Sequence, residues 1–315
     1  MDCQGKALDI SECGVFENLH SLHLGSINTG KAFVDDIVTY VSQNKALNEL
    51  SLSGSCGGDE GVATLIDTLV VAGSMKRFSL TDMDLSPDVV TGAAKLLALN
   101  PNVQLLSVTV ASWVPGPVLR EFFDALAADT ALRELRFHAR EDAFDTFAVA
   151  VVSVLKNTTT LREISIGVCL GLHLFDRLIG MLNALKQNRS VSKFTVRTGA
   201  LMPEIATSLS ELLAVNSTLN EVAFFNYGGI SPREVRIIAN GLKTNYTLTR
   251  LVVHCYSDDC EEMRYMAALL ERNVSLRNKA AEFVILGADV SDKEGVDALR
   301  KVHSNAANNL QGQRL

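Results

Sequence analysis

The segment from Gly25 to Lys31, GSINTGK, is the part of this chain that comes nearest to an enzyme motif. It fits G-x-x-x-x-G-K, a spacing in which backbone amides of a glycine-rich loop hold phosphate oxygens and the lysine reaches the outer phosphates. Ala32 follows it, however, where a nucleotide-binding loop carries the Ser or Thr that binds Mg²⁺. A strand-to-helix turn explains the same glycines. A nucleotide-binding enzyme is therefore kept only as an alternative.

Cysteines and histidines are the residue types that most often bind transition metals or act in nucleophilic catalysis. The six cysteines show no zinc-ligand spacing and stand at Cys3, Cys13, Cys56, Cys169, Cys255 and Cys260. His254 and Cys255, with Cys260 five residues on, come nearest to a metal cluster, but no second histidine lies nearby. No spacing typical of a Ser or Cys catalytic triad occurs. We expect free thiols, no metal, no cofactor and no catalytic residue.

Five N-x-S/T sequons would accept glycans in a secreted protein, and they begin at Asn157, Asn188, Asn216, Asn245 and Asn273. They recur with a regular spacing, each in a turn after a predicted helix, so a repeat unit alone would generate them. The opening residues, MDCQGKALDISECG, lack the basic and apolar regions of a secretory signal. We therefore expect a cytoplasmic protein without glycans.

The scaffold that positions all these residues is repetitive. An L-x-x-L-x-L-like triplet of apolar positions recurs nine times at intervals of 28 to 30 residues, beginning at Leu19, Leu47, Met75, Val103, Leu132, Leu161, Val191, Leu219 and Leu248. The period of two at the end of each triplet predicts a short strand. Between triplets, apolar residues at spacings of three, four and seven, such as Val34, Ile37, Val38 and Val41, predict an amphipathic helix. The sequence therefore predicts a β-α solenoid.

An asparagine follows most of the predicted helices, at Asn44, Asn100, Asn157, Asn188, Asn216, Asn245 and Asn273. Asparagine tolerates the left-handed backbone conformation that often ends a helix. We therefore predict that these residues are left-handed C-caps. Variation in repeat length then falls in the strand-to-helix loops, of which Gly167 to His173 is the longest.

β-α units of this length resemble the ribonuclease-inhibitor-like leucine-rich repeats, which also form the sensing tails of NOD-like receptors. The resemblance covers Leu19 to Leu276. It implies an α/β fold, a right-handed horseshoe with parallel strands on the concave face and helices on the convex face. Only Cys169 matches the Asn or Cys that the family places three residues after each strand, which implies a divergent member.

The domain organisation follows from the repeat. We expect a short N-terminal cap or truncated repeat in residues 1–18 and nine to ten repeats in residues 19–277. A C-terminal helical cap in residues 278–304 and a flexible tail in residues 305–315 complete the prediction. The small N-terminal cap raises the expectation that the chain is the sensing or regulatory part of a larger receptor-like protein.

Strand residues that alternate with the buried positions are predicted to line the concave face. Glu163, Lys193, Glu221 and Arg250 would form an alternating charge ladder across adjacent strands. Residue types that are enriched at interface hot spots also gather on this face. The candidate partner-binding residues are Arg197, Phe225, Tyr227, His254, Tyr256, Arg136 and His138.

The sequence favours a non-enzymatic protein-protein interaction module that binds its partner on the concave face. A net charge of −7 and the alternation of signs argue against a nucleic-acid groove. No apolar run approaches the ~18 residues of a membrane span, so no membrane partner is expected. An inhibitor of a ribonuclease-like enzyme is the main alternative, although the predicted face is mixed in sign. The identity of the partner and the oligomeric state stay open.

Overall fold

The computed structural model describes residues 19–24, 31–53, 58–110, 114–128, 131–139, 141–168, 175–198, 201–226, 228–256, 260–287, 289 and 291–303. The strands are β1 Ser21–Leu24, β2 Glu49–Ser53, β3 Arg77–Leu85, β4 Leu105–Val110, β5 Glu134–Ala139, β6 Glu163–Val168, β7 Lys193–Thr198, β8 Glu221–Asn226 and β9 Arg250–Val252. The helices are α1 Lys31–Gln43, α2 Gly58–Ala72, α3 Pro87–Leu99, α4 Gly116–Ala128, α5 Glu141–Asn157, α6 Phe175–Gln187, α7 Pro203–Val215, α8 Pro232–Leu242, α9 Glu261–Ile285 and α10 Lys293–Val302.

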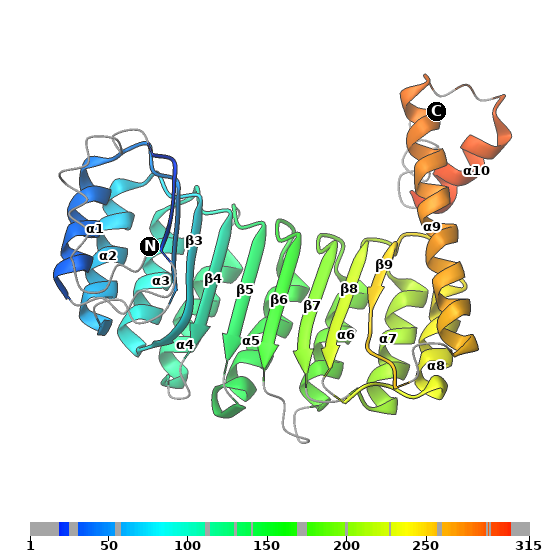
Figure 1. Cartoon of the computed structure of the whole chain (residues 1–315), viewed down its shortest axis with the longest axis horizontal. Coiled ribbons are helices and arrows are strands. Elements are labelled where there is room, and N and C mark those ends of the chain that lie inside the picture. Colours follow the sequence, from blue (N-terminus) through cyan, green and yellow to red (C-terminus); the bar gives the residue numbers. More distant parts are fainter. Residues whose placement is uncertain are drawn as a thin grey trace, which may run out of the picture. The chain divides into compact units, whose positions relative to one another are not determined.

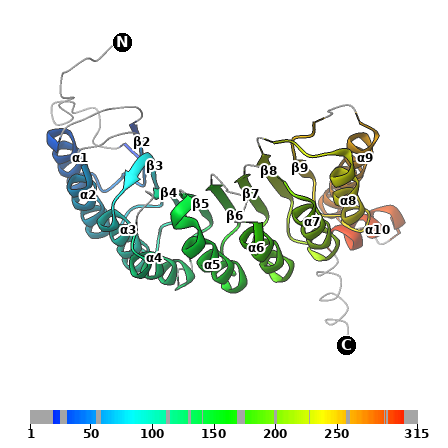
Figure 2. The same ribbon diagram turned by 90° about the horizontal axis from the view of Figure 1, so that it is seen from below.

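Each predicted triplet forms a strand, and the strands follow one another in the sheet in the order of the chain, β1 to β9. Pairing is parallel and in register with the repeat: Leu50 lies beside Phe78, for example, and Leu52 beside Leu80. Figures 1 and 2 show the helices on one side of the strands. The predicted β-α solenoid is confirmed.

The chain divides into two compact units, which are described separately. Unit 1 comprises residues 1–154 and 164–168, and unit 2 comprises residues 155–163 and 169–315. Unit 1 therefore holds β1 to β5 and most of β6, whereas unit 2 holds β7 to β9 and the helices from α6 onward.

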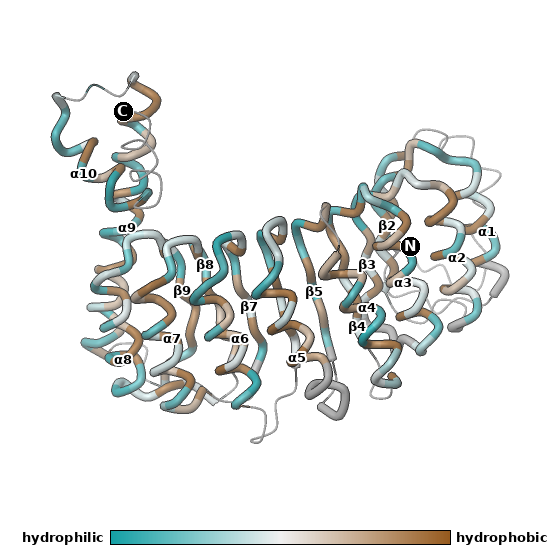
Figure 3. The backbone as a smooth tube through the Cα atoms, turned by 180° about the vertical axis from the view of Figure 1, so that it is seen from behind, coloured by the Kyte–Doolittle hydropathy of each residue, from teal (hydrophilic) through white to brown (hydrophobic). Residues whose placement is uncertain are grey.

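The core of unit 1 lies between its strands and helices, where strand residues such as Leu50 and Phe78 and helix residues such as Ile37 are fully buried. Near β5 the core becomes aromatic, and the Phe137 and Phe147 rings stack with centroids 3.9 Å apart. Unit 2 repeats the arrangement, with a Phe194–Phe224 contact at 6.3 Å. Hydrophobic segments accordingly recur along the strands and helices in Figure 3. Burial of this apolar area is the main stabilising term.

The helix-ending asparagines act differently from the prediction. Asn100 and Asn216 do occupy C-cap positions, but their backbones are extended, with φ of −115° and −88°. The predicted left-handed conformation is therefore wrong at both. The reason lies in the side chain. Asn216 Oδ1 accepts hydrogen bonds from the amides of Thr218 and Leu219 at 2.8 Å, while its Nδ2 donates to the carbonyl of Leu185 at 2.8 Å.

The same bonding pattern recurs at Asn188 and Asn245, whose side chains are also buried. Asn157 departs from it: its side chain is exposed at the end of α5, and the hydroxyl of Thr158 accepts the hydrogen bond from the Leu161 amide instead, at 3.1 Å. Asn157 therefore does not take the role predicted for it, and Thr158, the next residue, accepts the hydrogen bond instead.

The end of the solenoid is built by α9, which continues through Asn273 for three further turns and crosses the predicted boundary between residues 277 and 278. Asn273 therefore lies inside a helix and is not a C-cap, although its Nδ2 still donates to the Leu248 carbonyl at 2.7 Å. The second half of α9 extends past the strands, and α10 folds back beside it (Figure 1). Phe283 lies against Gly295, where a Cβ atom would clash with the ring.

Candidate interaction surface

The face of the strands that the helices leave uncovered carries the predicted charge ladder in unit 2. Lys193 Nζ lies 3.7 Å from a Glu163 carboxylate oxygen and 3.8 Å from one of Glu221. Arg250 Nη1 donates to the other carboxylate oxygen of Glu221, Oε1, at 3.0 Å. Each cation is therefore matched by a carboxylate on a neighbouring strand, and the surface is mixed in sign.

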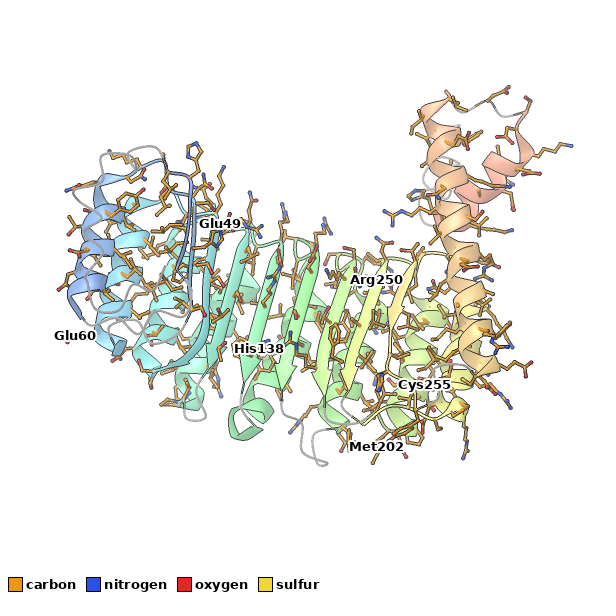
Figure 4. All side chains as sticks on the ribbon, viewed as in Figure 1. Glu49, Glu60, His138, Met202, Arg250 and Cys255 are labelled. Atoms are coloured by element: carbon orange, nitrogen blue, oxygen red, sulfur yellow. The ribbon has the colours of Figure 1, made fainter. Side chains whose placement is uncertain are left out.

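Unit 1 carries a similar set of ion pairs around Glu49. Its carboxylate accepts hydrogen bonds from Ser21 at 2.9 Å and from Arg77 at 3.2 Å. Burial by itself would raise the pKa of Glu49, but the hydrogen bonds from Ser21 and Arg77 outweigh burial and hold this pKa below its ordinary value. Arg77 also lies 3.8 Å from Glu134. Figure 4 labels Glu49 on its strand.

Unit 2 presents an exposed group of cationic and aromatic side chains, which we call the aromatic patch: Arg197, Phe225, His254 and Tyr256. Arg197 and Phe225 are direct partners in the β7–β8 register. Phe225 is 49% exposed and Tyr256 is 74% exposed, both high for aromatic residues. Val253 and Cys255 are buried, so His254 and Tyr256 alternate away from the core.

The local backbone explains how Tyr256 is presented. β9 ends at Val252, and the chain then pairs with the segment after β8: the Ile230 amide donates to the His254 carbonyl at 2.8 Å, and the Tyr256 amide donates to the Ile230 carbonyl at 3.1 Å. Gly229 has a positive φ of 63°, and a Cβ atom there would lie 2.9 Å from the Tyr256 ring. Glycine therefore permits both the turn and the close approach of the ring. Figure 4 labels Arg250, the first residue of β9, and Cys255, in the stretch that follows β9.

The other predicted site residues lie elsewhere. Arg136 and His138 are on β5 in unit 1, where Arg136 Nε donates to Glu134 at 2.6 Å. The His138 ring is half-buried and lies over Gly167 of β6, so close that a Cβ atom at position 167 would be 2.5 Å from Nε2. Tyr227 lies outside the described residues, as do residues 25–30 of the G-x-x-x-x-G-K segment.

Sequence reasoning missed the residues that hold the patch in place. Ile230 and Gly229 were assigned no role, although the Gly228-Gly229 pair is a turn signal that could have indicated a bend after β8. The described part of the chain contains no group of three or more metal-ligating side chains. Within the same residues, no helix is both long enough and apolar enough to cross a bilayer.

Comparison with known proteins does not assign this chain to a family. No protein-family model and no curated protein matches the chain. Among solved structures, the leucine-rich repeat-containing protein LegL7 from Legionella pneumophila is similar over 80% of this chain and 90% of its own, at 11% identity and a TM-score of 0.44. An internalin (inlF) from Listeria monocytogenes is similar over 81% and 85%, at 13% identity and a TM-score of 0.29.

The tropomodulin C-terminal domain of Caenorhabditis elegans is similar over 62% of this chain and 98% of its own, at 13% identity and a TM-score of 0.37. Of the three, LegL7 is described as a leucine-rich repeat-containing protein. Because every identity is below 25% and every TM-score is below 0.5, no property of these proteins is carried over to this chain.

Proposed function

We propose that this chain is a non-enzymatic protein-interaction module that binds its partner through the uncovered strand face, with the aromatic patch as the main contact. The observation that carries the proposal is the exposure of Phe225 and Tyr256 beside Arg197 on adjacent segments of unit 2. Exposed aromatic and arginine side chains on a preformed sheet supply contact area at low entropic cost.

The charge ladder favours a protein partner of mixed charge over a strongly basic partner such as a ribonuclease-like enzyme. An inhibitor of a basic enzyme needs an excess of carboxylates on its binding face, whereas Lys193 and Arg250 here neutralise Glu163 and Glu221. Within this proposal the chain is a cytoplasmic module of the ribonuclease-inhibitor-like type, and in a larger receptor-like protein it would be the sensing part.

The proposal is tested by affinity capture with quantitative mass spectrometry. Immobilised wild-type chain is compared with an Arg197→Ala/Phe225→Ala double variant, and Ser79→Ala, on the strand face of unit 1, is the control. We expect at least one protein to be enriched on the wild type and the control and to be lost from the double variant. Equal enrichment on all three would remove the aromatic patch as the site.

A further inference from the structure

The hairpin formed by α9 and α10 borders a groove that the strand-face proposal does not use. The groove has a volume of about 510 Å³, within the range of ~300–1,000 Å³ typical of ligand sites. One wall is helical, with Ala281 and Val284 on α9 and Val302 at the end of α10. The opposite wall is formed by the turns that precede β8 and β9, with Thr218, Asn220 and Thr247.

The helical wall is unusually apolar for a surface. Val284 is 56% exposed, and Ile285, which also lines the groove, is 81% exposed. Figure 3 shows this end of α9 in the hydrophobic colour. Adjacent aliphatic side chains that remain this exposed mark a surface suited to an apolar partner group.

The groove also contains polar groups without partners. Arg277 and His303 both line it, and among the described residues neither side chain has an ion pair or hydrogen bond. Thr247 at the base is 7% exposed, and its Oγ1 is a buried oxygen with no partner. The Thr247 hydroxyl costs free energy while it stays buried and unpaired, and the exposed Arg277 guanidinium is available to pair with an anionic group of a ligand.

Contacts on both sides of the hairpin hold the groove open before any ligand binds. The Arg272 guanidinium on α9 lies 4.5 Å from the centre of the Tyr246 ring, and Lys301 on α10 lies 5.8 Å from the same ring. Arg272 also donates to the carbonyls of Leu242 and Lys243 at 2.9 and 3.0 Å. These contacts join both helices to the turn before β9. Such preorganisation lowers the entropic cost of binding.

We propose that this groove binds a peptide segment of a partner protein in which a carboxylate side chain is flanked by aliphatic residues. The carboxylate would pair with Arg277, and the aliphatic side chains would cover Val284 and Ile285. The peptide backbone would exchange hydrogen bonds with Thr218 and Asn220 on the opposite wall. An isolated phosphate would satisfy Arg277 but would leave the aliphatic wall exposed, which is why the chemistry favours a peptide.

The test is selection from a phage-displayed library of random linear peptides on the full chain, followed by fluorescence anisotropy with the synthetic winners. We expect winners that carry Asp or Glu beside Leu, Ile or Val. Arg277→Glu should weaken their binding by roughly tenfold or more, as for the loss of a hydrogen bond between charged groups. Arg300→Glu is the matched control, because Arg300 is an exposed arginine of α10 that does not line the groove, and it should leave affinity unchanged.

A charge swap makes the test specific. A winner whose acidic residue is replaced by Lys should lose affinity for the wild type and regain it for Arg277→Glu. Ala281→Arg should block the groove, and Phe225→Ala on the strand face should have no effect. The proposal is overturned if no peptides are selected, if the winners lack a carboxylate, or if Arg277→Glu and Arg300→Glu behave alike. Binding to phosphatidylserine-containing vesicles in place of peptides would instead indicate a membrane-facing tip.

Discussion

Asn216 shows how a single side chain joins adjacent repeats. Its amide and carbonyl groups together bond the backbone of two turns, and the side chain is 3% exposed. Removing it would leave buried backbone donors and an acceptor unpaired, each at a cost of about 1–3 kcal/mol. The nitrogen of this side-chain amide is also the atom to which a glycan would be attached in an N-x-S/T sequon. Because the fold needs the asparagine for its hydrogen bonds, the fold accounts for the recurrence of the motif without glycosylation.

We predict that Asn216→Ala lowers the free energy of unfolding by roughly 2–4 kcal/mol, because several buried hydrogen bonds are lost at once. Urea denaturation followed by circular dichroism measures the change. Asn157→Ala is the matched control, since that side chain is exposed, and it should cost about 0.5 kcal/mol or less. Similar losses in both variants would show that the hydrogen bonds of the asparagine are unimportant.

Glu49 gives a prediction for pH dependence. Its pKa in the folded chain lies below the ordinary value, so the ionised form is favoured by folding. Its stabilising contribution is present above the pKa of the unfolded chain, about 4.3, and is lost as pH falls through the lower folded value. Wild type should therefore be more stable than Glu49→Gln near neutral pH, and the difference should shrink below pH ~4. A difference that is constant over this range in chemical denaturation would contradict the assignment.

At the scale of elements, α9 is where the repeat ends. The sequence predicted a break at residue 278 because the strand pattern stops there, but α9 runs through this position, and its segment is rich in Ala, Leu, Glu and Arg, which favour helix. Arg272 then caps α8 by donating to the carbonyls of Leu242 and of the C-cap residue Lys243, and it also donates to the carbonyl of Asn245 in the turn that follows. This side chain therefore joins the terminal helix to the end of α8 and to the turn before β9.

Arg272→Ala should loosen the whole hairpin, because the variant loses three hydrogen bonds to backbone carbonyls and the contact with Tyr246. We expect faster hydrogen exchange in α9 and α10, and a loss of roughly 2–4 kcal/mol in local stability. Hydrogen–deuterium exchange mass spectrometry measures the exchange rate of each segment. Arg300→Ala should leave the exchange of both helices unchanged, and an unchanged profile in Arg272→Ala would contradict the capping role.

At the scale of the whole molecule, periodicity was enough to predict the fold class and the position of each strand that the structure describes. The spacing of apolar residues predicts strand and helix because burial on one face dictates both. The charge ladder of unit 2 followed from register alone, since residues one repeat apart are neighbours in a parallel sheet.

The remaining features depend on contacts that no repeat pattern encodes. The extended backbone at Asn216 is set by hydrogen bonds to neighbouring turns, and the presentation of Tyr256 is set by pairing with Ile230 across a non-repeating turn. Each is a tertiary effect that overrides local preference.

The most direct test of the central claim is titration calorimetry between the chain and a partner identified by affinity capture. If the aromatic patch is the binding site, Arg197→Ala/Phe225→Ala should weaken the partner's affinity by about 30-fold, which corresponds to the ~2 kcal/mol typical of a hot spot. Helix-side variants Glu121→Ala and Arg177→Ala should bind like the wild type. Equal affinity for the wild type and the double variant, together with weakened binding in either helix-side variant, would contradict the account and place the interface on the helices.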